Sequence, residues 1–253
     1  MIRPSPTTWS DHEADRYLRM QARSDDVHHL GRALRRRLRG CRSLIDVGAG
    51  GGALGASIIP RGGSWRGIEP NARLAEQLAA TMLAHNCQSQ VIRQLWEDID
   101  PHLLPQAEVV LAARVPGIDN DPLAAWRWCS TLATRAVAWV ISATPPTGGL
   151  GLGAFLPAWL RDPRELISVD AVLAPLAGTA PTPHLSLVDW TWREHFVDYA
   201  TAYTAFALRI AHPSDSRQLA ALDVHLRGAL TRTTDGFIAS VPRRSAVCVF
   251  ALG

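Results

Sequence analysis

The sequence predicts an α/β fold, with a doubly wound and mostly parallel sheet of seven strands, and three observations indicate this fold. Short apolar runs, suited to the buried strands of a parallel sheet, alternate with segments of helical periodicity. A cluster of glycines at positions 48, 50, 51, 52 and 55 directly follows the first run. The acidic residue Glu69 ends the second run. Strand, glycine loop, helix, strand and acid in this order are typical of the nucleoside-binding half of such a fold.

The composition is that of an ordinary globular protein. Of the 253 residues 47% are hydrophobic and 19% are charged, which suits one α/β domain with an addition. No apolar run approaches the roughly 20 residues of a membrane span, and the N-terminus lacks the apolar core of a signal peptide. We therefore expect a cytoplasmic protein with no membrane partner. The four cysteines lack the spacing of metal ligands, so we expect free thiols and no metal site.

Residues 1–42 are predicted to form an N-terminal helical cap. Ser10 and Glu13 have the spacing of a capping box and predict a helix over residues 11–23. A second helix is expected over 26–39, with leucines on one face and arginines on the other. The basic run could bind nucleic acid or form a solvated helix face. The solvated face is favoured, because no aromatic residue interleaves the run and the opposite face is apolar.

Two ligands compete for the glycine loop. The pattern Gly48-x-Gly50-x-x-Ala53 satisfies the fingerprint of dinucleotide-binding proteins. Asp46, two residues before Gly48, would repel a pyrophosphate but suits the cationic amino group of S-adenosylmethionine. An acid such as Glu69, at the tip of the next strand, is placed to accept hydrogen bonds from both ribose hydroxyls. S-adenosylmethionine is therefore favoured, and a dinucleotide or a purely structural turn remain the alternatives.

At these residues the sequence resembles the class I S-adenosylmethionine-dependent methyltransferases, which have a Rossmann-like fold. Their first motif, acid-x-Gly-x-Gly-x-Gly, is matched from Asp46 to Gly52, and their second by Glu69 in the stretch 67–71. The resemblance implies S-adenosyl-L-methionine as cofactor and S-adenosyl-L-homocysteine as product. The residues expected to bind the cofactor are Asp46, Gly48, Ala49, Gly50, Gly52, Glu69, Pro70, Trp96, Glu97 and Ala112.

Further along the chain, a helix over 71–86 leads to strands over 90–92 and 108–115. In the family the segment after the third strand holds the adenine, often through an acid. Here Leu95 stands at that position, so Trp96 is a candidate to stack on the adenine and Glu97 or Asp98 to accept from its amino group. Packing of Trp96 beneath the sheet is the alternative.

The sequence assigns no catalytic residue and offers only candidates, because methyl transfer needs a base only when the nucleophile starts protonated. Arg114, just past the fourth strand, is expected to pair either with an anionic substrate group or with Asp119 or Asp121. Tyr17 is a second candidate and, like Trp9, is placed at the pocket by the resemblance, where such N-terminal helices cover the ligands. The histidines to test as bases are His29, His184 and His195.

The remaining chain is predicted to complete the sheet. A helix over 121–134 and a strand over 135–142 end the cofactor-binding core, residues 43–144. Residues 145–183 are expected to form a helical lid insertion over the site. Residues 184–253 are expected to complete the Rossmann-like sheet, with a strand over 185–190, helices over 191–208 and 215–231, and a closing strand over 246–252.

These observations predict a methyltransferase that transfers a methyl group to an O, N or C nucleophile of a small molecule by in-line displacement. Two alternatives stay open. One is an RNA methyltransferase that uses the basic run Arg32–Arg42, although no Asn-Pro-Pro-aromatic or Asp-Pro-Pro-aromatic signature follows the fourth strand. The other is a catalytically silent homologue that keeps the cofactor pocket. A monomer or a homodimer is expected, and nucleic acid is not the expected partner.

Overall fold

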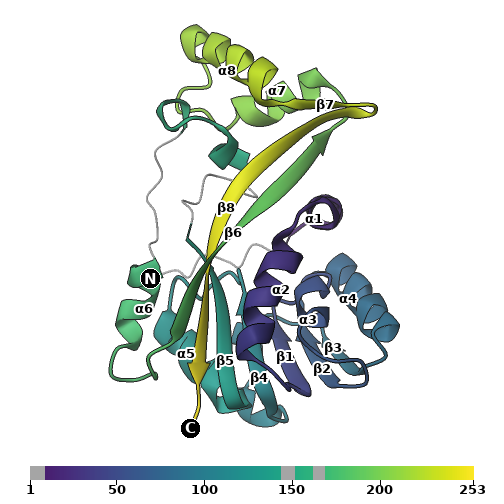
Figure 1. Cartoon of the computed structure of the whole chain (residues 1–253), viewed down its shortest axis with the longest axis vertical. Coiled ribbons are helices and arrows are strands. Elements are labelled where there is room, and N and C mark those ends of the chain that lie inside the picture. The colour runs from purple at the N-terminus through teal and green to yellow at the C-terminus, as the bar shows by residue number, and fades with distance from the viewer. Residues whose placement is uncertain (1–8, 144–151, 162–168) are drawn as a thin grey trace.

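A mixed sheet organises the chain in the structure, a computed structural model that describes residues 9–143, 152–161 and 169–253 (Figure 1). Within these residues the eight strands have the order β3-β2-β1-β4-β5-β8-β6, and β7 pairs with β8. The strands are β1 Ser43–Val47, β2 Ser64–Ile68, β3 Gln88–Ile92, β4 Ala107–Ala113, β5 Ala133–Ser142, β6 His184–Phe196, β7 Thr231–Thr233 and β8 Gly236–Ala251. Strands β1 to β5 pair in parallel, whereas β6, β7 and β8 pair antiparallel. The predicted α/β fold is confirmed, with β7 added to the seven expected strands.

The helices lie where periodicity and caps predict them in the first half of the chain. The α-helices are α1 Asp11–Arg23, α2 Asp26–Arg37, α3 Ala53–Ala56, α4 Ala72–Ala84, α5 Pro122–Leu132, α6 Val169–Leu173, α7 Tyr199–Ala207 and α8 Ser216–Ala229. The predicted capping box is confirmed, because Ser10 accepts from the Glu13 N–H while the Glu13 carboxylate accepts from the Ser10 N–H. The arginines of α2 are exposed, opposite the buried Leu30 and Leu34.

Helices cover both faces of the sheet, as a doubly wound fold requires. On one face α2, α3 and α4 pack against the sheet through residues such as Leu34 and Leu78. On the other face α5 and α6 pack through residues such as Trp126 and Val172. The parallel strands are buried between these layers, and their carboxyl ends carry the loops that form the site.

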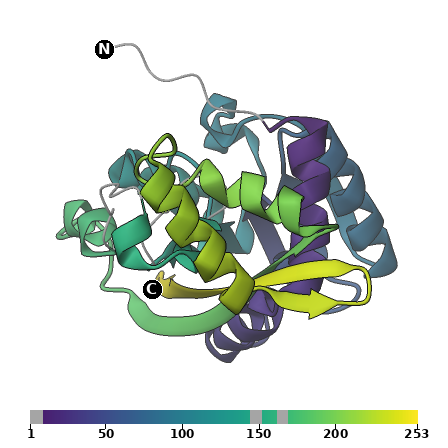
Figure 2. The ribbon, with the colours of Figure 1, turned by 90° about the horizontal axis from the view of Figure 1, so that it is seen from above.

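Strands β6 and β8 form a long antiparallel pair, called the hairpin below, that extends beyond the parallel sheet (Figure 1). At its far end α7, α8 and β7 connect the two strands. In the view from above, α7 and α8 lie nearest the viewer (Figure 2). The predicted helix over 191–208 is therefore wrong in its first part. Trp190, Trp192, Glu194 and Phe196 are buried, while the alternate residues between them are less so, which is the period of a strand, and this strand pairs with β8. Only Tyr199–Ala207 is helical.

The described residues of the expected lid, 145–183, lie in two places. Leu152, Leu156 and Leu160 pack in the same apolar cluster as α8, and His225 of α8 contacts the backbone oxygen of Phe155. Val172 and Leu176 instead pack against the α5 side of the sheet. Residues 144–151 and 162–168 lie outside the described part of the chain.

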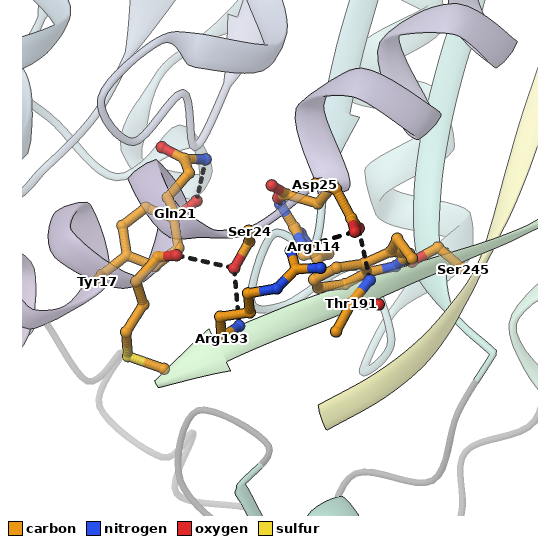
Figure 3. Close-up of polar contacts among 11 residues, drawn as sticks. Tyr17, Gln21, Ser24, Asp25, Arg114, Thr191, Arg193 and Ser245 are labelled. Atoms are coloured by element: carbon orange, nitrogen blue, oxygen red, sulfur yellow. Dashed lines mark hydrogen bonds and ion pairs between the residues drawn. The ribbon is translucent and has the colours of Figure 1, made fainter. Parts of the chain in front are cut away.

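The junction between α1 and α2 is bonded to the hairpin (Figure 3). The Thr191 N–H donates to Asp25 Oδ1 at 2.6 Å, and the Arg193 N–H donates to Ser24 Oγ at 3.0 Å. Arg193 Nη1 also donates to Asp25 Oδ2 at 3.2 Å. The N-terminal helices are thereby held against β6.

Across the described residues, no helix is long and apolar enough to cross a membrane.

Candidate ligand-binding site

A cavity of about 330 Å³ opens at the carboxyl ends of the parallel strands, beneath α1 and the hairpin. Its volume lies in the range of about 300–1,000 Å³ that small-molecule sites occupy. The lining residues are Trp9, Tyr17, Gly48, Gly50, Ile68, Glu69, Pro70, Asn71, Leu74, Leu95, Trp96, Glu97, Ala113, Arg114, Val115, Pro116, Trp190, Trp192 and Arg243. Segments far apart in the chain thus converge on one space.

The glycine loop presents bare backbone to this cavity. Gly48, Gly50 and Gly52 have φ angles of +59°, +56° and +81°, a left-handed backbone conformation that residues other than glycine rarely adopt. A Cβ atom on Gly48 would lie 2.9 Å from Val115 Cγ2, and one on Gly50 would lie 3.4 Å from the Tyr17 ring. The glycines therefore keep open the space between the loop and its neighbours.

Glu69 is bonded to the glycine loop across the site. Its Oε2 accepts from the Gly50 N–H at 2.9 Å, and its Oε1 accepts from the Asn71 N–H at 2.9 Å. Burial raises the pKa of this carboxyl, and the two backbone donors act in the opposite direction. Each oxygen retains a second lone pair, so the carboxylate can accept further hydrogen bonds from a ligand.

Asp46 lies under the loop. The residue is 3% exposed, and its Oδ2 is buried without a hydrogen-bond partner among the described residues. A Cβ atom on Gly55 would meet this same oxygen, so the helix α3 approaches it closely. Burial, together with the negative charge of Glu69, raises the pKa of Asp46 to about 8.

The raised pKa of Asp46 predicts a pH-dependent stability. The folded state retains the proton up to about pH 8, whereas the unfolded state loses it near pH 3.8, so stability falls as pH rises through this window. We expect Asp46→Asn to raise the free energy of unfolding at pH 9 by on the order of 2–4 kcal/mol. Each unit of pKa difference between the folded and unfolded states corresponds to about 1.4 kcal/mol, and relaxation around the charged carboxylate reduces the total. At pH 4 the two proteins should be nearly equal.

Urea denaturation of both proteins at pH 4 and pH 9 measures this effect. The matched control is Asp98→Asn, which removes an exposed carboxylate and should show little difference between the two pH values. A stability difference between Asp46→Asn and the parent that is the same at both pH values would contradict the prediction.

Aromatic side chains from α1, from the residue just before its cap and from β6 form one wall of the cavity. The ring of Tyr17 packs edge-on against Trp9, with centroids 5.1 Å apart, and lies 5.9 Å from Trp192. Trp190 follows at 5.7 Å from Trp192. Gln21 donates to the Tyr17 hydroxyl at 3.0 Å (Figure 3). This wall is therefore mostly apolar, and its contacts fix the position of the Tyr17 ring.

Arg114 projects into the same region from the end of β4. Its Nη2 donates to Asp26 Oδ2 at 2.7 Å, and its guanidinium carbon lies 5.0 Å from the centroid of Trp190. Asp26 has no exposed surface. The alternative that Arg114 bridges to Asp119 or Asp121 is wrong, because the start of α2 supplies the carboxylate. Arg114 itself has a φ of +57°, which places it in the sparsely populated left-handed region.

Trp96 and Glu97 line the cavity from the 3-10 turn Trp96–Asp98 that follows β3. Trp96 Nε1 donates to the Pro116 oxygen at 3.4 Å, and its ring packs edge-on against Trp128 of α5 at 5.6 Å. The indole thus contacts α5 and still borders the cavity. A flat ring at this place can stack on a nucleobase.

The cavity brings together most of the residues expected to bind a cofactor. Gly48, Gly50, Glu69, Pro70, Trp96 and Glu97 line it. Four other expected residues, Asp46, Ala49, Gly52 and Ala112, are not among the described lining residues. Of the catalytic candidates, Arg114 and Tyr17 line the cavity. His195 instead lies with Nε2 3.3 Å from Asp235 Oδ2 near the turn of the hairpin.

Sequence reasoning missed the contribution of the hairpin to the cavity. Trp190, Trp192 and Arg243 all line it. The alternation Trp190-x-Trp192-x-Glu194-x-Phe196 has the period of a strand and could have indicated one buried face. Arg243 shows no local signal, because only the pairing of β8 with β6 brings it to the site. No cluster of His, Cys, Asp or Glu suited to a metal ion occurs in the described ranges.

Comparison with known proteins gives similarities in fold only. No family model matches the sequence, and no curated protein matches it. Magnesium protoporphyrin IX methyltransferase from Synechocystis PCC 6803, with bound SAH, is 13% identical, with a TM-score of 0.47 over 97% of this chain and 89% of that one. A SAM-dependent methyltransferase from Thiobacillus denitrificans, in complex with S-adenosyl-L-homocysteine, is 13% identical, with a TM-score of 0.47 over 90% and 91% of the two chains. At 13% identity these similarities concern the fold, and the ligand has to be inferred from the residues of the cavity.

Proposed function

We propose that this protein is an S-adenosylmethionine-dependent methyltransferase that acts on a small-molecule acceptor. The observation that carries the proposal is the buried Glu69 carboxylate, held by the Gly50 N–H beside a left-handed glycine loop. A carboxylate fixed at the tip of the second strand is suited to the two hydroxyls of a ribose. The loop next to it allows a ligand to lie against its backbone.

The negative charge beside the glycine loop favours a cation over a pyrophosphate at that end of the cavity. Glu69 and Asp46 lie near enough that the charge of Glu69 raises the pKa of Asp46. A pyrophosphate would add negative charge beside the Glu69 carboxylate, whereas a sulfonium or ammonium group would be attracted to it. This difference supports S-adenosylmethionine over a dinucleotide such as NAD.

The residues of the cavity suit such a cofactor in distinct roles. Glu69 would accept from the ribose, the backbone at Gly48 and Gly50 would border the ligand, and Trp96 would stack on the adenine. When bound, the cofactor supplies an activated methyl group and its own leaving group. The chain then has to position an acceptor and exclude water from it.

Positioning is the main role that we propose for the chain in catalysis. Arg114 and Tyr17 border the cavity, and none of its described lining residues is a histidine. An acceptor that reacts as an anion, or as a neutral amine with a free lone pair, needs no histidine base. We propose that the protein acts in the cytoplasm, as a monomer or homodimer, without a nucleic-acid or membrane partner.

Thermal unfolding with added S-adenosylmethionine, S-adenosylhomocysteine or NAD tests the proposal. A ligand at about 100 times its dissociation constant stabilises the folded state by about 2.7 kcal/mol, equivalent to about 5–10 °C in Tm for a chain of this size. We expect a shift of this size with S-adenosylmethionine and with S-adenosylhomocysteine, and none with NAD. A shift with NAD alone would show that the cavity holds a dinucleotide.

A further inference from the structure

The hairpin places a second cation beside Arg114. Trp190 of β6 and Arg243 of β8 are directly opposite in the antiparallel ladder, so their side chains emerge next to each other on one face. Both line the cavity. The Arg114 guanidinium lies over the ring of the same Trp190. Arg114, just after β4, and Arg243 of β8 therefore bring two cations to one part of the cavity wall.

The two cations create a positive region within the cavity. Burial, and next the charge of Arg114, lower the pKa of Arg243 to about 10, which shows that each arginine lies in the field of the other. Asp26 binds one nitrogen of Arg114 and balances part of this charge. The two acids among the described lining residues, Glu69 and Glu97, instead follow β2 and β3, which are not adjacent to β4 or β8 in the sheet.

Flat apolar surfaces adjoin the two cations. Trp190 and Trp192 lie 5.7 Å apart, with their rings inclined by 74°. Tyr17 lies 5.9 Å from Trp192 on the side of the glycine loop, where its ring approaches Gly50. The wall thus runs without interruption from the loop to the arginines. A planar group fits against such rings, and a guanidinium binds a carboxylate or phosphate through paired hydrogen bonds.

We propose that this wall binds the acceptor and selects a planar molecule that carries an anionic group, a carboxylate or a phosphate, with Arg243 as the specificity-determining residue. The proposal rests on the proposed methyltransferase function and names the class of its substrate. The rings of Tyr17, Trp190 and Trp192 contact the planar body, and Arg243, with Arg114, binds the anion. Arg114 is bonded to the buried Asp26, so Arg243 is the arginine that can be replaced without breaking that ion pair.

Calorimetric titration of the protein, saturated with S-adenosylhomocysteine, tests this inference. The probes are indole-3-carboxylate, the neutral indole-3-carboxamide and indoxyl phosphate. Loss of a charged hydrogen-bond pair corresponds to a change of about 10- to 100-fold in affinity. We expect at least one anionic probe to bind about 10-fold or more tightly than the carboxamide, and this preference to fall with added salt.

Variants of neighbouring arginines assign the effect to one residue. Arg243→Gln should abolish the preference for the anion, and Arg243→Lys should retain part of it, while both still bind S-adenosylhomocysteine. The matched control is Arg244→Gln, because Arg244 is the next residue but is exposed and paired with Asp189. The control should keep the full preference. Circular dichroism verifies that each variant is folded, and Arg243→Lys replaces Arg243→Gln if the latter does not fold.

The outcomes separate the two proposals. If S-adenosylhomocysteine does not bind the parent protein, the proposed function fails. If it binds but the carboxamide binds as tightly as both anions, or no probe binds at 10 mM, the acceptor inference is overturned alone. A preference that survives in Arg243→Gln also overturns it. Selective binding of the carboxylate or of the phosphate supports it and identifies which anion the wall prefers.

Discussion

Replacing Glu69 by alanine is expected to weaken the binding of S-adenosylhomocysteine by about 100-fold or more, because charged hydrogen bonds contribute about 1.5–3 kcal/mol each. Two losses combine in this variant. The ribose loses its acceptor, and the N–H groups of Gly50 and Asn71 lose the partner that holds the loop. Glu69→Gln should lose less, because its amide keeps one oxygen as an acceptor.

Tryptophan fluorescence provides the affinity for each variant, since Trp96, Trp190 and Trp192 border the cavity. The matched control is Glu76→Ala on α4, where an exposed carboxylate lies beside Arg73. This control should leave the affinity unchanged. An affinity of Glu69→Ala close to that of the parent protein would remove the ribose role of Glu69.

Replacing Arg114 by methionine is expected to lower the free energy of unfolding by about 3–5 kcal/mol, the cost of leaving one partner of a buried ion pair alone. Asp26 would remain as a carboxylate with no exposed surface and no cation beside it. Its other oxygen, Oδ1, already lacks a partner among the described residues. The contact of the guanidinium with Trp190 would also be lost.

A double-mutant cycle isolates this cost. Asp26→Asn combined with Arg114→Met removes both charges and should be more stable than Arg114→Met alone. Urea denaturation provides the four free energies of unfolding. The control Arg244→Met breaks an exposed pair with Asp189 and should cost at most about 1 kcal/mol. Equal effects of Arg114→Met and Arg244→Met would show that the buried pair contributes no more than a surface pair.

The parallel half of the fold was predictable because its determinants are local. The run ending at Val47, the glycines after it and Glu69 lie within a short stretch, and the Ser10–Glu13 capping box predicts α1 directly. The hairpin was not predictable in the same way. The aromatic residues from Trp192 to Tyr203 fit a helical period as well as a strand period, and pairing with β8, far along the chain, decides between them.

Some residues of the candidate site were likewise predictable from local sequence, and others were not. The loop, Glu69 and Trp96 were expected at the ligand from their positions after strands, and they line the cavity. Arg243 comes to the cavity through the register of two distant strands, which a single sequence does not reveal. The partner of Arg114 was mistaken for the same reason. Asp119 and Asp121 are near in sequence, but Asp26 is near in space.

Calorimetric titration of the unmodified protein with S-adenosylhomocysteine, and separately with NAD, tests the central claim most directly. We expect one binding site per chain for S-adenosylhomocysteine, with a dissociation constant of about 1–100 μM, equivalent to about −8 to −5.5 kcal/mol. No heat of binding is expected with NAD. Binding of NAD without binding of S-adenosylhomocysteine would contradict the claim, and Glu69 would then be the ribose ligand of a dinucleotide.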